Sequence, residues 1–439
     1  MDRKPEDFTG LTLLLKDEYT AYQPDTVFSY SNLGMTLLGH AVQEVSGRPY
    51  SEQIRQELLI PIGMTDSYIA KQLDNSSQSS KGYADKKEAN AIPLRDLPAG
   101  GLNSTVLDLA RFTQMIFSDG RVGKQQIIQE ETLREMLSFQ DGDAPFDLGQ
   151  QMIGLGWFLD TQLGDKAGVR AVHGGSTFLF HSLLMTLPKH RLAVIVLANS
   201  DSAADVVNDI AEDAIKLALE IKTGIKVSDN DELSVKALPA KAAGLGTFPG
   251  YYSTPAGLVE IKRKGDKLQV IVNDDTLELV RHENNLFYLQ YKILGIFPVD
   301  LEGLEKLGIS RTEIAEHEIL TAEHQGQRMV IGSKIVAQTI PESWKNRVGE
   351  YEVINQQRGI KFKEIALIIK NDLLLLKVGI QLPHQSKVEE TGQVVLMAKG
   401  DQVAVIHGLN AGSGETIRVV QQNGEELLAY SGFLLRHVQ

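Results

Sequence analysis

The chain has no cysteine among its 439 residues. Thiolate nucleophiles, disulfides and cysteine-ligated zinc are therefore excluded. Positive charge is also scarce, because 44 lysines and arginines stand against 57 acidic residues, for a formal net charge of −13. No dense run of basic residues offsets this deficit, so neither nucleic acid nor an anionic membrane surface is expected as a partner.

Long apolar runs are missing as well. The longest, such as Leu-Ala-Val-Ile-Val-Leu-Ala at residues 192–198, have the length of a strand. A membrane-spanning helix needs roughly 18 or more such residues, so no membrane span is predicted. The first residues, Met-Asp-Arg-Lys-Pro-Glu-Asp, lead into no apolar stretch typical of a signal peptide.

A chain of this length is too long for one compact core. Helical periodicity dominates the first half, and strand-like alternation with frequent turns dominates the second. We expect a first domain at residues 1–225, a polar linker at 226–243, and two β units at 244–340 and 341–439.

A short internal repeat supports the division of the second half. Gly250-Tyr251-Tyr252 corresponds to Gly349-Glu350-Tyr351, 99 positions further on. This spacing fits two related β units of about a hundred residues each, or two halves of one larger barrel.

Within the first domain, apolar residues at helical spacing predict a helix from Leu33 that ends at Gly47. A second helix is expected from Ser51 as its cap to Leu59, and the polar stretch from Lys71 to Asn90 is expected as an exposed loop. The pattern beyond residue 150 predicts antiparallel strands at 153–159, 178–187 and 192–198, followed by a helix that ends near Gly224.

Three polar stretches carry the functional signal. They are, in chain order, Tyr30-Ser31-Asn32, Ala99-Gly100-Gly101-Leu102 and His173-Gly174-Gly175. In this order and spacing they resemble the β-lactamase-related serine hydrolases, a family that includes class C β-lactamases, D-alanyl peptidases, D-aminopeptidases and family VIII esterases. The resemblance covers roughly residues 20–222.

The resemblance implies an α+β fold, in which an antiparallel sheet is packed with helices and the N-terminal part is missing. A mostly antiparallel β region with one or more lipocalin-like barrels would follow. It implies acyl transfer through a serine ester, with no metal and no cofactor, on a small-molecule or peptide substrate. The parent protein would be exported to the periplasm or the outside of the cell.

The resemblance also implies roles for particular residues. Tyr30 would be the general base and acid, and Asn32 would bind the substrate by a hydrogen bond. His173 would replace the lysine of the third family motif, which favours esters or D-amino-acid amides over carboxylate-bearing penicillins. Gly174, Gly175 and Ser176 would line the substrate site, with the Ser176 N–H as one oxyanion donor.

The chain departs from the family at one point. No Ser-x-x-Lys, the motif that supplies the nucleophile and its lysine, occurs in the sequence. At pH 7 a phenolate lies about three pKa units, or roughly 4 kcal/mol, above the phenol unless a cation such as this lysine stabilises it. We therefore expect negligible turnover by this chain.

Two origins are compatible with the missing motif, a truncated hydrolase or a natural pseudoenzyme. Truncation would expose apolar surface and favour self-association. The rival function is that of a non-catalytic binding protein, in which the old cleft or the β region holds a peptide, glycan or lipid. Gly100 and Gly101 are expected to form a turn, Ser104 and Thr105 to cap a helix, and His181 to be structural.

Overall fold

The computed structural model describes residues 10–16, 30–70, 79–94, 96–140, 152–227, 245–254, 257–265, 267–272, 275–293, 297–299, 307–314, 317–324, 327–356, 361–381, 389–408 and 414–438. These residues form two compact units. The first holds the described residues within 10–16, 31–140 and 152–227, and the second holds Tyr30 and the described residues from 245 onward. The expected linker at 226–243 lies almost entirely outside the described residues.

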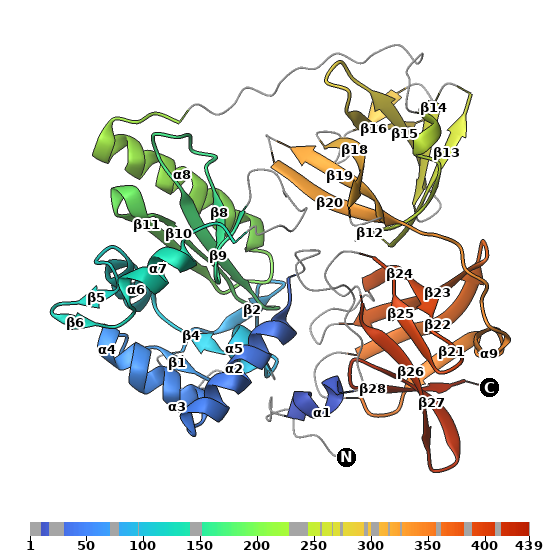
Figure 1. Cartoon of the computed structure of the whole chain (residues 1–439), viewed down its shortest axis with the longest axis horizontal. Coiled ribbons are helices and arrows are strands. Elements are labelled where there is room, and N and C mark those ends of the chain that lie inside the picture. Colours follow the sequence, from blue (N-terminus) through green and yellow to red (C-terminus); the bar gives the residue numbers. More distant parts are fainter. Residues whose placement is uncertain are drawn as a thin grey trace. The chain divides into compact units, whose positions relative to one another are not determined.

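The first unit mixes helices with a sheet (Figure 1). Its helices are α1 (Leu11–Leu15), α2 (Asn32–Ser46), α3 (Tyr50–Ile54), the π-helical η2 (Arg55–Leu59), α4 (Ile60–Ile62), α5 (Leu97–Gly100), α6 (Val106–Ile116), α7 (Glu130–Met136) and α8 (Ala204–Thr223). No helix in the described part of the chain is long and apolar enough to cross a membrane.

The main sheet of this unit has the strand order β11-β10-β9-β8-β7. Its strands are β7 (Met152–Ile153), β8 (Phe158–Asp160), β9 (Arg170–Ser176), β10 (His181–Leu187) and β11 (Leu192–Ala198), all antiparallel to their neighbours. Short two-stranded pairs are formed by β1 (Tyr68–Ile69) with β4 (Leu102–Asn103), β2 (Gly82–Ala84) with β3 (Lys87–Ala89), and β5 (Arg121–Val122) with β6 (Gln125–Gln126).

Helices cover both faces of this sheet because successive strand residues point to opposite sides. Leu183 and Met185 of β10 face α8, where they pack with buried residues of that helix such as Val207 and Ile215. The intervening Leu184 packs on the other side against the core of α6 and α7. The observed layers confirm the expected α+β fold class.

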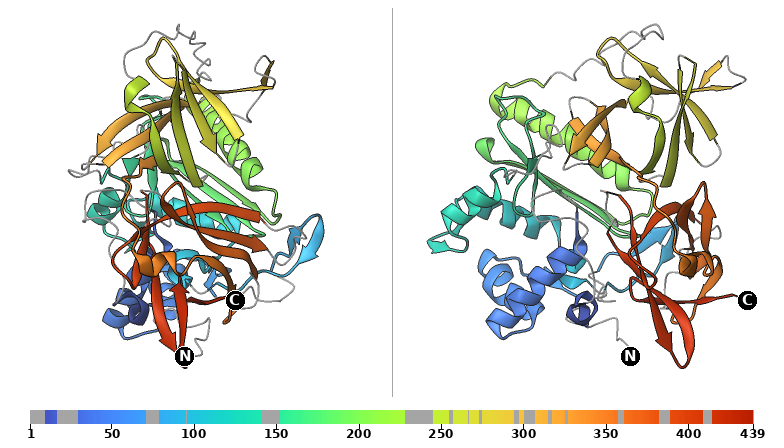
Figure 2. Two further views of the ribbon diagram at one scale, coloured as in Figure 1. Left: turned by 90° about the vertical axis from the view of Figure 1, so that its right-hand side faces the viewer. Right: turned by 45° about the vertical axis from the view of Figure 1, so that its right-hand side comes forward.

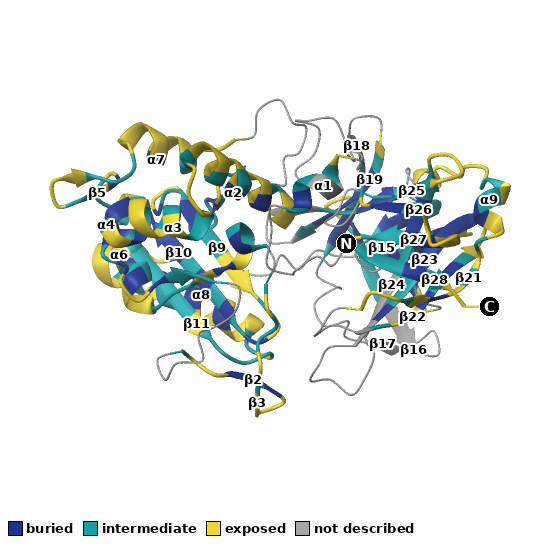
Figure 3. Cartoon of the chain, turned by 90° about the horizontal axis from the view of Figure 1, so that it is seen from below, coloured by how far each residue is buried: buried dark blue, intermediate teal, exposed yellow. Residues whose placement is uncertain are grey.

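Helix α2 confirms the predicted span. Ser31 caps its start, and Gly47 ends it in the left-handed conformation with φ +67°. The residues whose spacing predicted the helix are largely exposed, as Figure 3 shows, and the buried positions are Thr36 and Gly39. The apolar side therefore faces outward, with Leu38 60% and Val45 91% exposed.

Three local expectations for the first unit were wrong. Residues 153–159 form two strands rather than one, because Gly154 N–H donates to the Trp157 carbonyl and closes a hairpin turn. Residue 51 is not a helix cap, since Pro49 precedes α3. Within residues 71–90, the described end is a hairpin whose Gly82 packs against Leu179.

The second unit begins with a closed ring of strands. Its described strands are β12 (Gly250–Thr254), β13 (Gly257–Lys264), β14 (Lys267–Val272), β15 (Asp275–Arg281), β16 (Phe287–Ile293), β17 (Phe297–Val299), β18 (Gly308–Ile314), β19 (His317–His324) and β20 (Gln327–Lys334), after the short η4 (Leu245–Thr247). Pairing of β15 with β16 and of β12 with β20 closes eight of these described strands into a barrel, while β17 pairs only with β16 among them.

A second barrel follows helix α9 (Glu342–Lys345), and Figure 2 shows it from two further sides. Its described strands are β21 (Gly349–Val353), β22 (Lys361–Lys370), β23 (Leu373–Gln381), β24 (Glu389–Ala398), β25 (Val403–Ile406), β26 (Thr416–Gln422), β27 (Glu425–Tyr430) and β28 (Phe433–His437). The two observed barrels confirm the expected barrel-like β region.

The internal repeat has a structural meaning. Tyr252 donates its phenolic hydrogen to the Phe248 carbonyl at 2.8 Å, and Tyr351 donates to the Arg347 carbonyl at 2.6 Å. In each barrel the tyrosine thus ties the first strand to the chain four residues before it. Burial raises the pKa of each hydroxyl to about 12, since the phenolate would lose its hydration.

Side chains fill the inside of both barrels. The first is packed with buried residues such as Tyr252, Leu268 and Phe287, and the second with Trp344, Leu367 and Ile417. This is the arrangement of a small barrel whose core is its own side chains.

The two barrels touch through an apolar patch, where Ile335 and Tyr251 pack against Leu373 and Leu375. Next to it, Ser253 Oγ donates to the His407 carbonyl at 2.7 Å. Burial, and then the nearby His317 and Lys399, lower the pKa of the His407 imidazole to about 4.

This histidine predicts an acid sensitivity of the second unit. Unfolded histidine has a pKa near 6.5, so between pH 6.5 and about 4 the unfolded chain binds the extra proton and stability falls as the pH falls. The loss reaches up to roughly 3 kcal/mol at the acid end. We expect the melting temperature of the second unit to fall on acidification, and His407→Gln to remove most of this slope. The exposed His437→Gln should leave the slope unchanged.

Candidate functional site

The Tyr-Ser-Asn stretch forms the start of α2. Ser31 has an extended backbone, and its Oγ accepts a hydrogen bond from the Gly34 N–H at 2.9 Å. Asn32 is the first helical residue and is exposed, and Tyr30 before it is 45% exposed. Ser31 therefore acts as the helix cap, while the two residues beside it are accessible to a ligand.

The His-Gly-Gly stretch lies on β9, in the interior of the sheet. Each of its residues pairs with β10, with His173 opposite Leu184 and Gly175 opposite Ser182. A Cβ added to Gly175 would stand 2.6 Å from Ser182 Oγ, so a side chain there would displace the Ser182 hydroxyl. Gly174, Gly175 and Ser176 are all exposed.

The imidazole of His173 is held in one orientation. Its Nδ1 lies 2.7 Å from the Gly174 carbonyl oxygen. Because a carbonyl can only accept, Nδ1 carries the hydrogen, and in the neutral ring Nε2 is then an acceptor. The ring also contacts Phe158, with the two centroids 5.9 Å apart.

Ser176 and His181 form a hydrogen-bonded pair, with Ser176 Oγ 2.9 Å from His181 Nδ1. This resembles a nucleophile beside its base. However, His181 is only 8% exposed, and its Nε2 is buried without a hydrogen-bond partner. Among the described residues no group contacts Nε2, so the third group that orients the histidine of a catalytic triad is lacking there. His181 remains structural and orients the Ser176 hydroxyl.

The Ala-Gly-Gly-Leu stretch packs against the helix that carries Asn32. A Cβ added to Gly39 of α2 would meet Pro98 Cγ at 2.1 Å, so α5 lies directly on the α2 backbone. Gly101 follows α5, and its N–H donates to the Leu97 carbonyl. The structure thus packs the Ala-Gly-Gly-Leu stretch against α2, the helix that begins with the Tyr-Ser-Asn stretch.

A network of hydrogen bonds fixes the backbone next to this stretch. Thr105 caps α6 by accepting from the Asp108 N–H at 3.2 Å. The Asp108 carboxylate is fully buried and accepts from the Asp66 N–H and from Ser67 Oγ, both at 2.8 Å. Ser104 Oγ reaches Ser67 Oγ at 2.7 Å rather than capping the helix.

A buried ionic cluster at the start of β9 was not predicted from the sequence. Arg170 is 5% exposed, and its Nε donates to both oxygens of Asp160 at 3.1 and 3.0 Å. The same guanidinium pairs with Glu212 of α8 and donates to Gln162. The sequence feature that could have revealed this cluster is a single arginine within the otherwise apolar run Val169-Arg170-Ala171-Val172. The cluster anchors the strand that carries His173.

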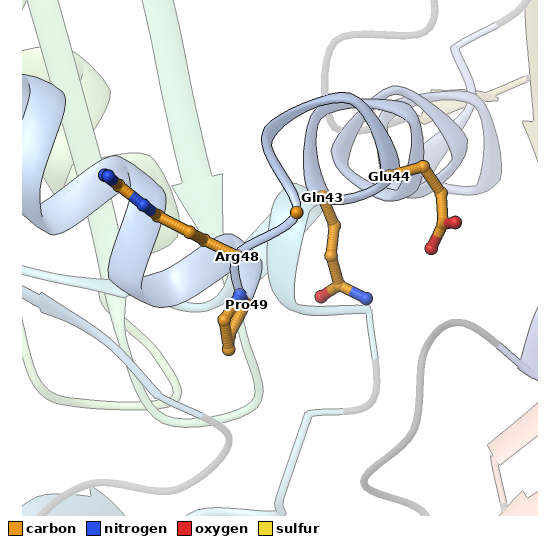
Figure 4. A pocket seen from close by; sticks show the side chains of 5 residues that line it. Gln43, Glu44, Arg48 and Pro49 are labelled. Carbon is orange, nitrogen blue, oxygen red and sulfur yellow. The ribbon is translucent and has the colours of Figure 1, made fainter.

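A shallow depression of about 340 Å³ lies at the other end of α2, lined by Gln43, Glu44, Gly47, Arg48 and Pro49 (Figure 4). Fifteen helical residues separate the two ends of α2 by about 20 Å. The depression is therefore remote from the exposed Tyr30 and Asn32.

Comparison with known proteins finds a family model and relatives that match the first half of the chain. Residues 7–218 match the family model described as Beta-lactamase. A D-aminopeptidase of Gluconobacter oxydans is 24% identical over 42% of this chain and 34% of its own length. The D-alanyl-D-alanine-carboxypeptidase/endopeptidase AmpH of Escherichia coli K12 is 24% identical over 43% of this chain and 50% of its own length.

The chain thus spans between a third and a half of the length of these relatives. Among solved structures, SurE is 19% identical with a TM-score of 0.52, over 76% of this chain and 74% of its own. SurE with D-Leu gives a TM-score of 0.51 at the same identity, over 76% and 73%. This coverage exceeds that of the family model, so the shared fold includes part of the barrel region.

The matched family model and the named relatives agree with the three stretches found in the sequence. They bear on the first unit, where α2 and β9 lie. The comparisons support a domain of the β-lactamase-related serine hydrolase family at residues 7–218.

Proposed function

We propose that the first unit is a serine-hydrolase domain for D-amino-acid amides or peptides, and that this chain binds such ligands without turning them over. The observation that carries the proposal is the combination of an accessible Tyr30 and Asn32 at the start of α2, an oriented His173 on β9, and no Ser-x-x-Lys in the sequence. In this proposal Asn32 and His173 contact the ligand, and Tyr30, which would carry the proton in an intact hydrolase, has no Ser-x-x-Lys serine to activate.

The substrate class rests on two lines of support. The relatives include proteins named as a D-aminopeptidase and a D-alanyl-D-alanine carboxypeptidase, and a fold neighbour was solved with D-Leu. In addition, the hydrogen bond from His173 to the Gly174 carbonyl leaves Nε2 as an acceptor. An acceptor suits the ammonium or amide N–H of an amino-acid amide better than the carboxylate of a penicillin.

The packing of the β region favours a ligand site in the first unit over the rival site inside a barrel. Buried side chains such as Leu268 and Trp344 occupy the inside of each barrel. A lipid or glycan held inside a barrel would have to displace this core. We therefore assign ligand binding to the first unit.

The proposal predicts binding without chemistry. Incubation of the full chain with a fluorophosphonate or a penicillin should give no stoichiometric adduct by intact-mass spectrometry, and D-leucine p-nitroanilide should not be hydrolysed above the buffer rate. By contrast, D-leucinamide should raise the melting temperature of the first unit more than L-leucinamide. Loss of one ligand hydrogen bond in His173→Ala should weaken D-leucinamide binding about tenfold.

A matched control is His190→Ala, which removes a histidine from the turn after β10 and should leave D-leucinamide binding unchanged. A stoichiometric adduct would show that another residue of this chain serves as the nucleophile. Equal binding of the two enantiomers, or no effect of His173→Ala, would reject the proposed ligand class and site.

A further inference from the structure

The turn between β26 and β27 contains the one Asn-Gly pair of the sequence, Asn423-Gly424. The two strands form a hairpin that extends beyond the other strands of the second barrel in Figures 1 and 2. Glycine has no Cβ, so its backbone nitrogen can approach the side chain of the preceding asparagine without a steric barrier. The side-chain amide of Asn423 is therefore open to attack by the backbone.

The backbone conformation explains why these two residues stand in the turn. Gln422 pairs with Glu425, so only two residues connect the strands. Both have positive φ, +54° at Asn423 and +82° at Gly424, as in the type I′ turn that two-residue hairpins favour. Asparagine and glycine tolerate positive φ better than other residues. The turn thus accounts for the pair, and the reactivity of the pair comes with it.

Nothing in the described part of the chain shields the pair. Both residues are exposed. A Cβ built on Gly424 would have no atom within 4 Å. Among the described residues, no hydrogen bond holds the Asn423 side-chain amide or the Gly424 N–H. The attacking nitrogen and the carbon that it would attack are therefore both free to move once the turn opens.

Two other turns serve as references within the same chain. Asn371 and Asp372 connect β22 with β23, have φ of +54° and +60°, and are both exposed, but the second residue carries a side chain. Asp119 and Gly120 also have positive φ, but Gly120 is buried and its N–H donates to the Met115 carbonyl at 3.0 Å. Among the described turns, only that between β26 and β27 combines an asparagine, a following glycine and full access.

We propose that Asn423 is a site of spontaneous deamidation. The Gly424 nitrogen attacks the side-chain carbon Cγ of Asn423, the new N–Cγ bond closes a five-membered succinimide ring, and the Cγ–Nδ2 bond breaks. The proton of the Gly424 nitrogen leaves with the amide nitrogen as ammonia. One water then opens the ring, either at Cγ, which gives aspartate, or at the Asn423 backbone carbonyl carbon, which gives isoaspartate. No oxidant or reductant takes part.

The folded turn controls when the ring can close. A near-planar five-membered ring needs an Asn423 ψ far from the value of about +30° that a type I′ turn gives its first central residue. The strand pairs Gln422 with Glu425 and Gln421 with Glu426 hold that turn closed. The end of the hairpin must therefore open before the reaction, so the rate depends on how often it opens.

The product affects a contact at the end of the barrel. Isoaspartate adds one carbon to the backbone of a two-residue turn and places a carboxylate beside Glu425 and Glu426. Glu426 accepts from Nε and Nη2 of Arg347 at 2.7 and 3.0 Å, and that guanidinium lies over the Trp344 ring. A displaced end of β27 weakens this contact, so modified chains should have a less stable C-terminal barrel than fresh ones.

The first test follows deamidation of the full chain during incubation at mildly alkaline pH, by peptide mapping with mass spectrometry that separates isoaspartate from aspartate. Asn423 should react about tenfold faster than Asn371, because no Cβ hinders the attacking nitrogen. Isoaspartate should be its major product. Asp119, which precedes a buried glycine, should form no isoaspartate.

An exchange of one residue tests the role of the glycine in a matched turn. Asp372→Gly places a glycine after Asn371, and deamidation of Asn371 should then rise about tenfold, to the level of Asn423. Unfolding of the wild-type chain in urea should accelerate the reaction at Asn423, since the turn no longer limits ring closure.

A separate measurement tests the effect on the barrel. The aged chain, rich in isoaspartate, should melt at a lower temperature in its second unit than the fresh chain. Asn423→Asp carries the new charge without the extra backbone carbon, so it should lower the melting temperature less than isoaspartate does.

Three results would overturn the assignment of this site: an Asn423 that stays intact in the folded chain while the urea-unfolded chain reacts, equal rates at Asn423 and Asn371, or no rise at Asn371 in Asp372→Gly. An aged chain that melts like the fresh one would reject the predicted loss of barrel stability.

Discussion

Arg170→Met is expected to destabilise the first unit by about 3–5 kcal/mol, the usual cost of removing one partner from a buried ion pair. The substitution leaves the Asp160 carboxylate 3% exposed and without its guanidinium, next to Glu212, which loses the same partner. Chemical denaturation followed by circular dichroism should show an earlier first-unit transition, with the barrel transitions unchanged.

Two further variants separate the buried charge from the shape of the side chain. Arg134→Met breaks an exposed pair with Glu130 and should cost less than about 1 kcal/mol. Arg170→Met combined with Asp160→Leu removes both charges of the buried pair and should recover part of the lost stability. If the double variant is less stable than Arg170→Met alone, uncompensated charge is not the cause.

Trp344→Ala is the second large effect, with an expected loss of about 3–5 kcal/mol from the C-terminal barrel. The indole is fully buried in the barrel core, and its N–H donates to the Gly400 carbonyl at 2.7 Å. The Arg347 guanidinium lies over the ring at 5.2 Å from the centroid. Truncation therefore leaves a cavity, an unsatisfied carbonyl and a lost cation–π contact together.

The matched control for this variant is Val336→Ala, at a position that is 74% exposed. It should change the melting temperature of the second unit very little, because exposed substitutions seldom exceed about 0.5 kcal/mol. Tryptophan fluorescence would report the loss of one of the two indoles, so the barrel transition should be followed by circular dichroism. A barrel that melts normally without Trp344 would contradict the packing described for its core.

The exposed apolar residues of the first unit bear on the expected self-association. The outer side of α2 carries Leu38 and Val45, and α8 carries Leu217 and Ile221, all more than half exposed. Most exposed apolar residues on proteins are single and need no explanation, whereas rows of them mark interaction sites.

Local sequence signals determined several elements of this protein. Ser31 and Gly47 set the ends of α2, since a serine oxygen can cap the first turn and glycine readily adopts the left-handed end conformation. The turn at Pro188-Lys189-His190 set the register of β10 with β11. The 99-residue repeat identified two equivalent tyrosines, and the three polar stretches identified the family.

Other features depended on residues far apart in the chain. Periodicity predicted the span of α2, but the contact of Gly39 with Pro98 decides which side of the helix packs. The cluster of Arg170 with Asp160 and Glu212, and the closure of β15 on β16, join segments that no local pattern connects.

The sequence alone therefore determined the ends of α2 and the strands β10 and β11, since caps, turns and alternation act over a few residues. It also determined that the chain contains the Tyr-Ser-Asn and His-Gly-Gly stretches of the family without Ser-x-x-Lys. Only the tertiary structure decided which apolar faces are buried and which strands pair to close the barrels. The physical reason is that burial and strand pairing depend on the partner brought there by the whole fold.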